Sequence, residues 1–229
     1  MKIIDRYEQK YYLSNNQFKE LINKLNKYIV KDKYFNETIY NIYFDNDYFD
    51  LINKSMEKPL YKEKVRMRSY YKTNFDTKVF LEIKKKYKSN SNKRRVIINY
   101  KEYLDYINKS IIPNCDKQIM SEINYCFEKN NLKPKIKLIY DRLAYNLKDD
   151  YSFRITFDTN IRYNLCEMDF NNNDKDIMFM DSGYIMEIKT FKGIPIWLNE
   201  LLNKIKIFPC SYSKVGKIYE KIKEGGLYV

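Results

Sequence analysis

The 229-residue chain contains no histidine and only five glycines. Without histidine there can be no Ser-His-Asp or Cys-His catalysis, no histidine-ligated zinc and no imidazole general base. The glycines, at positions 183, 193, 216, 225 and 226, fit neither the GxxxxGK[ST] nor the GxGxxG pattern. The sequence therefore excludes P-loop and Rossmann phosphate cradles. Any phosphate that this protein handles must be bound by side chains.

Paired cysteines and long apolar runs are also missing. Cys115, Cys126, Cys166 and Cys210 are far apart and form no CxxC pair, so we exclude a zinc knuckle and expect four reduced thiols. No apolar run approaches the roughly 18 residues that a membrane span needs. Residues 1–10 lack the hydrophobic stretch of a signal peptide. These absences predict a cytoplasmic protein without a membrane segment.

Basic residues are in excess, because 43 Lys and Arg against 30 Asp and Glu give a formal charge of +13. Hydrophobic residues make up 44% of the chain, which is enough for a core. The length suits one domain, which we expect to span residues 1–229. An AT-rich genome would enrich lysine without selection on function. The positions of the basic residues must therefore show which of them matter.

The hydrophobic pattern predicts strands interspersed with helices and no internal repeat. Strands are expected near residues 3–13, 37–44, 61–71, 78–86, 93–99, 135–146, 151–159 and 184–190. Helices are expected after a Ser14-x-x-Gln17 capping box, and near 46–57, 100–109, 116–130, 195–206 and 213–224. Residues 164–181 are rich in acidic side chains and are expected to form an irregular surface loop. The pattern predicts an α+β fold with about eight strands.

At least five strands carry charged side chains on one face and apolar side chains on the other, because successive side chains alternate. In the strand near 61–71, the face opposite Val65 and Met67 is basic. The charged faces hold Lys62, Lys64, Arg66 and Arg68; Arg6, Glu8 and Lys10; Glu82, Lys84 and Lys86; Arg154 and Asp158; and Glu187 and Lys189. Such alternation is typical of an ordinary amphipathic sheet whose charges face water.

A second interpretation follows from the amphipathic helices, which need an apolar surface to pack on. If they cover the outer face of a closed sheet, the charged faces point inward, and about eight strands leave room for one slim ligand. We therefore expect an antiparallel eight-stranded β-barrel tunnel with helices packed outside. Its wall would be lined by Lys and Arg, which a threaded polyanion would neutralise.

Eight motifs, in order, resemble the VTC-type polyphosphate polymerase domain, a CYTH-like branch of the triphosphate tunnel metalloenzymes. They are RYEQKYYL, IYFDNDYFD, KEKVRMRSYY, VFLEIKK, KPKIKLIYDRLAY, FRITFDTNIR, IMEIKT and YSK, and the resemblance covers residues 5–220. It implies an eight-stranded tunnel that binds nucleoside triphosphate and inorganic polyphosphate. It also implies transfer of the γ-phosphate of ATP onto polyphosphate, or onto a primer such as pyrophosphate, with Mn²⁺ or Mg²⁺.

The resemblance also implies roles for individual residues. It places Arg66, Arg68, Arg154, Lys189 and Lys214 at the reacting phosphates, and Lys10, Lys64, Lys84, Arg142, Ser213 and either Lys93 or Arg94 along the phosphate-binding wall. Glu187 is the implied metal ligand. Glu8 and Glu82 are implied either to join the metal shell or to orient neighbouring lysines.

The chain departs from related triphosphatases, which begin with a Glu-x-Glu-x-Lys strand, because Arg6 replaces the first carboxylate. Fewer metal ligands favour a polymerase. A triphosphatase or tripolyphosphatase that uses water as acceptor, a non-catalytic polyphosphate or nucleotide sensor, and a nucleic-acid binder stay open as alternatives. The last is disfavoured, because Glu8, Glu82 and Glu187 share strand faces with the cations and would repel a nucleic-acid backbone.

Overall fold

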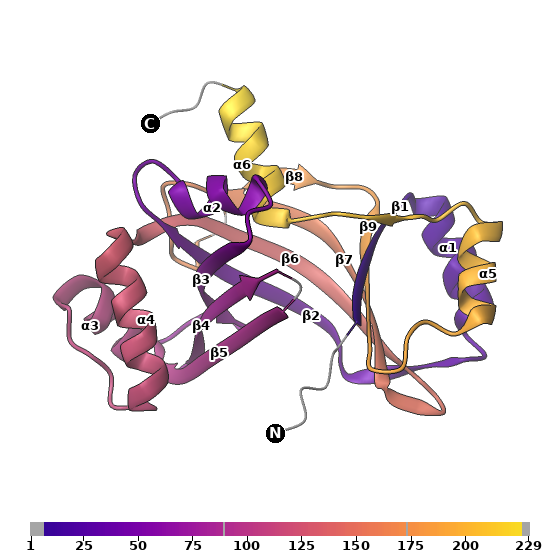
Figure 1. The fold of residues 1–229 in the computed structure, drawn as a ribbon, viewed down its shortest axis with the longest axis horizontal. Coiled ribbons are helices and arrows are strands. Elements are labelled where there is room, and N and C mark those ends of the chain that lie inside the picture. The colour runs from indigo at the N-terminus through magenta and orange to yellow at the C-terminus, as the bar shows by residue number, and fades with distance from the viewer. Residues whose placement is uncertain (1–6, 89, 173, 226–229) are drawn as a thin grey trace. The chain divides into compact units, whose positions relative to one another are not determined.

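The computed structural model describes residues 7–88, 90–172 and 174–225. Arg6, which the first predicted strand includes, lies outside the described residues. The elements are β1 (Tyr7–Leu13), α1 (Asn15–Leu25), β2 (Ile29–Asp45), α2 (Asp50–Met56), β3 (Tyr61–Ser69), β4 (Lys78–Tyr87), β5 (Asn90–Asn99), α3 (Tyr100–Lys109), α4 (Lys117–Asn130), β6 (Lys133–Leu147), β7 (Asp150–Asn164), β8 (Ile177–Met180), β9 (Tyr184–Thr190), α5 (Ile196–Lys204), β10 (Pro209–Cys210) and α6 (Lys214–Glu224). Figure 1 shows them in chain order.

The strands form one ten-stranded sheet in the order β10-β1-β9-β7-β6-β2-β3-β4-β5, with β8 paired to β7 off this path. The mixture of helices with a large antiparallel sheet is confirmed. The eight-stranded closed barrel is wrong, because the described residues contain ten strands and the sheet is open between β5 and β10. Both edges resist pairing: β10 has two residues, one of them Pro209, and β5 carries Lys93, Arg94 and Arg95.

The chain forms two compact units, each built from three separate stretches. Unit 1 comprises residues 1–38, 140–161 and 178–212, and unit 2 comprises residues 39–139, 162–177 and 213–229. The single domain expected over residues 1–229 stays a prediction. The two units are described separately below.

In unit 1, α1 and α5 pack against the apolar faces of β1, β7 and β9 (Figure 1). The core includes Tyr11, Leu13, Leu21, Leu25, Phe153, Ile155, Phe157, Met186, Ile188, Leu198 and Leu202. The predicted capping box is confirmed, since Ser14 Oγ accepts from the Gln17 backbone N–H at 3.2 Å and Ser14 N–H donates to Gln17 Oε1 at 3.0 Å. The helix is thereby fixed directly after β1, with its apolar side towards the strands.

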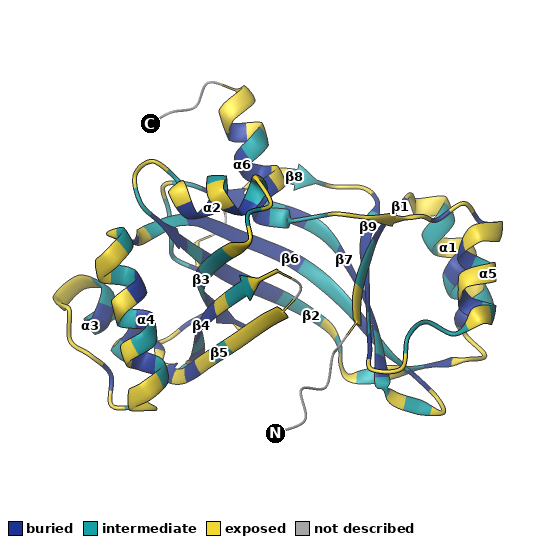
Figure 2. Cartoon of the chain, viewed as in Figure 1, coloured by how far each residue is buried: buried dark blue, intermediate teal, exposed yellow. Residues whose placement is uncertain are grey.

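In unit 2, α3 and α4 cover the apolar faces of β3, β4 and β5 (Figure 1). This core includes Val65, Met67, Leu81, Ile83, Val96, Tyr103, Ile123 and Cys126. Val65, Met67, Leu81 and Ile83 are buried, whereas Lys64, Arg66 and Lys84 are partly or fully exposed, and Figure 2 shows this mixture of classes along β3 and β4. The predicted division of the strands into apolar and charged faces is confirmed, and it leaves the charged face of β3–β5 opposite the helices.

The acidic segment 164–181 is not wholly an irregular surface loop. It contains β8, and Phe170 is fully buried in the core of unit 2. Lys137 Nζ lies 2.8 Å from Asp176 Oδ1, and both side chains are buried. Lys137 Nζ also donates to the carbonyl oxygens of Asp169 and Asn172, at 3.0 and 2.7 Å. Because Asp176 is paired with a buried lysine, its carboxylate can be buried, although an acidic segment is expected to face solvent.

All four cysteines are free thiols, as predicted. In the described part of the chain, none of the helices combines the length and the apolarity that a membrane-spanning helix requires.

Candidate functional site

The charged face of β3–β5 in unit 2 is built in rows, because residues directly opposite each other on paired strands point to the same side. Arg66 pairs with Tyr43 of β2 and with Glu82 of β4. The neighbouring rows join Lys64, Lys84 and Lys93, and then Lys62 and Lys86. We call this set the cationic face, and it comprises Lys62, Lys64, Arg66, Arg68, Lys84, Lys86, Lys93 and Arg95, the last of which is the β5 partner of Glu82.

Glu82 is the carboxylate at the centre of the cationic face. Its Oε2 accepts from Arg66 Nε at 2.7 Å, and its Oε1 lies 2.5 Å from Lys93 Nζ, although Glu82 is only 1% exposed. Burial alone would raise its pKa, but the charges of Arg66, Arg68 and Lys93 outweigh burial and lower the pKa of Glu82 to about 2. Of the two roles implied for Glu82, orienting neighbouring cations fits this geometry.

Tyr43 is a site residue that the sequence did not reveal. Its hydroxyl accepts from Arg66 Nη1 at 3.0 Å, and the Arg66 guanidinium lies 5.8 Å from the centroid of its ring. Tyr43 and Glu82 therefore hold the guanidinium from two sides. The IYFDNDYFD motif pointed to this strand, but only the register of β2 against β3 places Tyr43 beside Arg66.

Tyr43 is expected to ionise near pH 8. Burial would raise its pKa, but Arg66, Arg68 and Lys64 together lower the pKa of Tyr43 from 10 to about 8. Between about pH 7 and pH 9, the ultraviolet tyrosinate absorbance should show one early-titrating tyrosine that Tyr43→Phe removes. Tyr34→Phe, at an exposed position of unit 1, should leave the titration unchanged. Identical titrations of the parent and Tyr43→Phe would contradict the assignment.

Arg68 is held by a second residue that the sequence did not reveal. Arg68 Nε donates to Asn41 Oδ1 at 3.0 Å, and Asn41 Nδ2 donates in turn to the carbonyl oxygen of Leu138 at 3.2 Å. Asn41 is fully buried, and Arg68 is 7% exposed. The buried Asn41 amide fixes the orientation of the Arg68 guanidinium. The side chain therefore loses less conformational entropy when an anion binds to it.

Ser213 brings the start of α6 to the cationic face. As the N-cap of α6, its Oγ accepts from the Gly216 backbone N–H at 3.3 Å, and it also accepts from Lys64 Nζ at 3.1 Å. A Cβ on Gly216 would lie 3.2 Å from the Ser213 side chain, so glycine permits this close approach. Lys214 is the first residue of α6. A helix N-terminus next to two lysines favours an anion.

Lys93 and Arg94, the alternatives for one phosphate contact, lie on opposite faces of β5. Lys93 is on the cationic face, beside Glu82. Arg94 instead points to the helix side, where its Nη1 lies 3.1 Å from Glu122 of α4. Glu122 also pairs with Lys85 at 2.6 Å. The structure therefore brings Lys93, but not Arg94, together with Arg66 and Lys84.

Unit 1 contains a second group of the predicted residues, on β1, β7 and β9. Lys189 pairs in register with Glu8 and Arg154, and Glu187 pairs with Lys10 and Thr156. Lys189 Nζ lies 3.0 Å from Glu187 Oε1 and 4.0 Å from Glu8 Oε2. Lys10 Nζ lies 3.8 Å from Glu8 Oε1 and donates to the carbonyl oxygen of Tyr212 at 2.9 Å. Two carboxylates and two ammonium groups are thus neighbours on one strand pair.

The two predicted arginines of unit 1 both have carboxylate partners. Arg142 binds Asp158 through two contacts, of 2.6 and 2.8 Å, and the Asp158 side chain is fully buried. Arg142 is desolvated, which would lower its pKa, but Asp158 outweighs this and holds the Arg142 pKa well above its ordinary value. Arg154 Nε lies 3.3 Å from Asp32 Oδ2. Arg142 therefore has a bidentate structural partner, whereas Arg154 has one longer contact.

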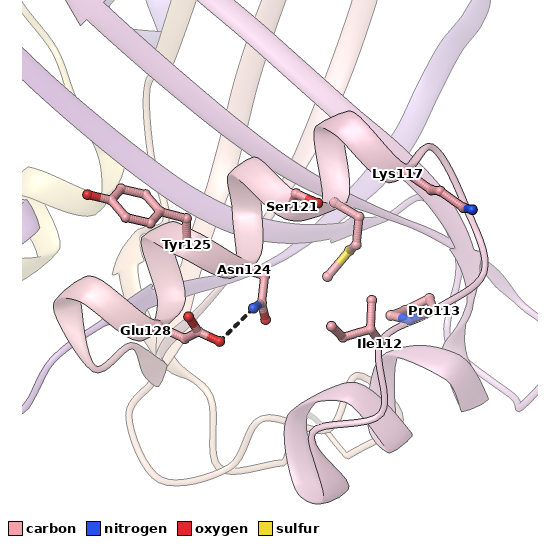
Figure 3. Close-up of a pocket in the computed structure, with 8 residues that line it drawn as sticks. Ile112, Pro113, Lys117, Ser121, Asn124, Tyr125 and Glu128 are labelled. Atoms are coloured by element: carbon pink, nitrogen blue, oxygen red, sulfur yellow. Dashed lines mark hydrogen bonds between the residues drawn. The ribbon is translucent and has the colours of Figure 1, made fainter.

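Two hollows in the described surface lie mainly outside these groups. A cavity of about 490 Å³ in unit 1 is lined by Tyr7, Glu8, Gln9, Ile188, Thr190, Gly193, Ile194 and Asn199, of which only Glu8 is a predicted site residue. A cavity of about 300 Å³ in unit 2 lies between α4 and residues 112–113 (Figure 3). Asn124 Nδ2 donates there to Glu128 Oε1 at 2.7 Å, and none of the predicted site residues lines it.

The described residues contain no group of three or more Cys, Asp or Glu side chains placed to hold a metal ion. A metal at the predicted carboxylates would therefore need further oxygen ligands from water or from a bound molecule.

Comparisons with solved structures show the fold. A proposed adenylate cyclase from Bacillus halodurans has a TM-score of 0.56 and 14% identity, with 90% of this chain and 92% of that chain covered. The PH1819 protein from Pyrococcus horikoshii OT3 has a TM-score of 0.48 and 15% identity, with 94% and 99% covered. A proposed adenylate cyclase from Vibrio parahaemolyticus has a TM-score of 0.47 and 9% identity, with 93% and 97% covered. At such identities the likeness concerns fold alone.

The sequence comparisons identify the family. No curated protein sequence matches the chain. The VTC domain family matches residues 5–222, which is nearly the whole chain and the same region as the eight motifs. The protein belongs to the VTC domain family.

Proposed function

We propose that the protein is an ATP–polyphosphate phosphotransferase that moves the γ-phosphate of ATP onto inorganic polyphosphate. The observation that carries the proposal is the cationic face, where Arg66 and Arg68 are held by Tyr43, Glu82 and Asn41. Fixed guanidinium forks suit phosphate oxygens. Membership of the VTC domain family supports the same activity.

Phosphoryl transfer requires alignment and charge neutralisation more than a protein nucleophile. Arg66 and Arg68 would hold the β- and γ-phosphates, and Lys64, Ser213 and Lys214 would bind a neighbouring phosphate at the start of α6. A terminal oxygen of the acceptor chain attacks the γ-phosphorus, the bond to the β–γ bridging oxygen breaks, and ADP leaves. No histidine is needed for these steps.

The predicted phosphate contacts of unit 1, namely Lys10, Arg142, Arg154 and Lys189, stay predictions. Arg154 and Lys189 fit such a role better than Arg142, because Arg142 already binds Asp158 through two contacts.

The family resemblance implies Mn²⁺ or Mg²⁺, and the carboxylates of unit 1 fit that expectation. Glu8 and Glu187 both lie near Lys189 and offer the hard oxygen ligands that these ions prefer. Mg²⁺ is commonly bound by one or two carboxylates together with substrate phosphates. When bound there, the ion would neutralise charge on phosphate oxygens. Glu82 does not fit, because Arg66 and Lys93 take both of its oxygens.

The activity is tested by incubating the purified protein with ATP and Mn²⁺ or Mg²⁺, with and without a polyphosphate primer. A polymerase yields ADP and a phosphatase-sensitive polymer in matching amounts. Release of free phosphate without polymer would instead indicate a triphosphatase or tripolyphosphatase. Binding of ATP or polyphosphate without turnover would indicate a sensor.

Glu187→Ala is expected to lower the metal-dependent rate by about 10²-fold, because it removes one of two candidate metal ligands. A titration of the rate against Mn²⁺ should show a higher metal requirement in Glu187→Gln. Glu128→Ala, an exposed carboxylate of α4, is the matched control and should behave like the parent. Full activity at the parent's metal requirement in Glu187→Ala would overturn the metal assignment.

A further inference from the structure

At one end, the cationic face of unit 2 passes into aromatic and aliphatic side chains. Arg68 of β3 is directly opposite Phe80 of β4, and Phe80 is directly opposite Ile97 of β5. Because side chains directly opposite each other point to the same side of a sheet, Phe80 and Ile97 share the face of Arg68. Tyr70 follows β3, and its ring meets the Phe80 ring edge to face, with 5.5 Å between the centroids. We call Tyr70, Phe80 and Ile97 the aromatic end of the face.

The aromatic end is separate from the hydrophobic cores. In the part of the chain that the structure describes, none of its three residues belongs to the core of unit 2, which holds the neighbouring residues Val79 and Val96. Ile97 is 52% exposed, and Phe80 is only partly buried. Single exposed apolar residues are common on protein surfaces, but here three lie together on a face otherwise dominated by Lys and Arg. These side chains are therefore available to a ligand.

Arg95 adds a planar charged group to the aromatic end. Its guanidinium lies over the Phe80 ring, 4.8 Å from the centroid. Among the described residues, the Arg95 side chain makes no ion pair or hydrogen bond, so this ring contact is what holds it. Nucleobases stack both on aromatic rings and on guanidinium planes. Phe80 and Arg95 together therefore offer the surface that a base requires.

The backbone around Tyr70 is held in place without a ligand. Ser69 Oγ donates to the carbonyl oxygen of Tyr71 at 2.7 Å and accepts from the Tyr71 backbone N–H at 3.2 Å. The carbonyl oxygen of Thr73 accepts from Asn171 Nδ2 at 2.7 Å, which ties down the segment that follows. Because these contacts order the turn beforehand, less conformational entropy is lost when a ligand binds beside it.

The aromatic end lies close enough to the arginines for one nucleotide to reach both. Neighbouring strands are about 4.8 Å apart, so Phe80 lies about 5 Å and Ile97 about 10 Å from the line of β3. Arg66 is two residues from Arg68 along β3, a distance of about 7 Å. A nucleoside triphosphate whose phosphates lie along Arg68 and Arg66 can therefore place its base over β4 and β5. Inorganic polyphosphate has no group that an aromatic surface would bind.

We infer that the aromatic end, together with Arg95, is a stacking site for the base of the nucleoside triphosphate whose phosphates are held at Arg66 and Arg68. The inference rests on the proposed function and deepens it, because it separates the phosphoryl donor, which carries a base, from the acceptor, which does not. Phe80 and Ile97 have no side-chain hydrogen-bonding groups with which to read the edge of a base. Stacking uses the ring face that every base has, so ATP and GTP are both accepted.

Phe80→Leu removes the ring and keeps an apolar side chain. It should weaken the binding of the β,γ-imido analogue of ATP on the order of tenfold, because a base-stacking contact is lost. The affinity for inorganic tripolyphosphate should change by less than about twofold. Phe80→Tyr keeps a ring and should bind both probes like the parent. Calorimetric titration of the whole protein with each probe gives the Kd values.

Two further variants control the comparison. Tyr125→Leu removes an exposed ring from α4 and should bind both probes like the parent. Ile97→Ser alters a half-exposed position of β5, so it tests the site even if Phe80→Leu fails to fold. It should weaken the ATP analogue by about threefold or more and leave tripolyphosphate unchanged. Thermal unfolding of each variant ensures that only folded protein is compared.

Parent-like affinity for the ATP analogue in folded Phe80→Leu and Ile97→Ser would overturn the stacking site, and so would an equal loss of tripolyphosphate affinity. A parent preference of more than about tenfold for the ATP analogue over the GTP analogue would also contradict it. If the parent makes polymer from ATP and any of these results is found, the proposed function stands and only the stacking site fails. If the parent makes no polymer but Phe80→Leu selectively loses the ATP analogue, the stacking site stands and the proposed function fails.

Discussion

Arg66→Ala is expected to reduce ATP-dependent phosphoryl transfer by about 10²–10³-fold, the loss found for one well-placed charge-stabilising donor. The orientation of Arg66 is fixed by Glu82 at 2.7 Å and by the Tyr43 hydroxyl at 3.0 Å. Its positive charge would stabilise the negative charge that develops on the transferred phosphoryl group. Initial rates of ADP formation at saturating ATP measure the effect.

Two further variants test whether the loss of rate comes from the guanidinium group of Arg66 and not from a general loss of positive charge. Arg66→Lys keeps the charge but loses the planar fork, so its rate should lie between those of the parent and Arg66→Ala. Lys85→Ala removes a cation from the opposite face, where its partner is Glu122, and should retain the parent rate. If folded Arg66→Ala keeps more than about a tenth of the parent rate, Arg66 does not act on the reacting phosphates.

Glu82→Gln is expected to destabilise the fold by about 3 kcal/mol, because it leaves Arg66 and Lys93 facing each other without a buried counter-charge. Urea unfolding at neutral pH, followed by circular dichroism, measures this change. Glu220→Gln, which removes an exposed carboxylate paired with Lys217 on α6, should cost less than about 1 kcal/mol. Equal stabilities of Glu82→Gln and the parent would show that the cationic face does not need this carboxylate.

The same carboxylate predicts an acid dependence. The pKa of Glu82 falls from 4.5 to about 2 in the folded protein. Its stabilisation is therefore present above about pH 4.5 and is lost as the pH falls towards 2. The parent should lose stability over this range more steeply than Glu82→Gln, by about 3 kcal/mol in total. Parallel acid curves for the two proteins would contradict the lowered pKa.

The sequence was a good guide to the faces of the strands and a poor one to the extent of the sheet. Alternation placed Val65 and Met67 in the core and Arg66 on the charged face, because side-chain direction follows from local geometry. Ile29 lies four residues after Leu25, a spacing that also fits a helix, but in the structure α1 ends at Leu25 and Ile29 begins β2. The predicted closure of the sheet into a barrel was wrong for a different reason. The alternation of side chains does not show which strands pair, or whether the two edge strands of the sheet meet.

The residues of the candidate site likewise fall into those that the sequence predicted and those that it missed. Sequence motifs found the cations of β3 and β4, since charged residues two apart on a strand must share a face. Tyr43 and Asn41 were missed, because their closeness to Arg66 and Arg68 depends on a register that strand β2 sets. Lys93 and Arg94 could not be separated, because the number of loop residues before β5 decides which of them faces Glu82.

The link between Ser213 and Lys64 joins residues that are 149 positions apart. During synthesis, the lysines and arginines of β3 and β4 leave the ribosome long before α6, whose N-cap residue Ser213 contacts Lys64. The nascent chain thus exposes a basic sheet in a cell rich in RNA and other polyanions, and such surfaces attract them without specificity. Because each unit is assembled from early and late stretches of chain, completion of either fold must wait for the last of them.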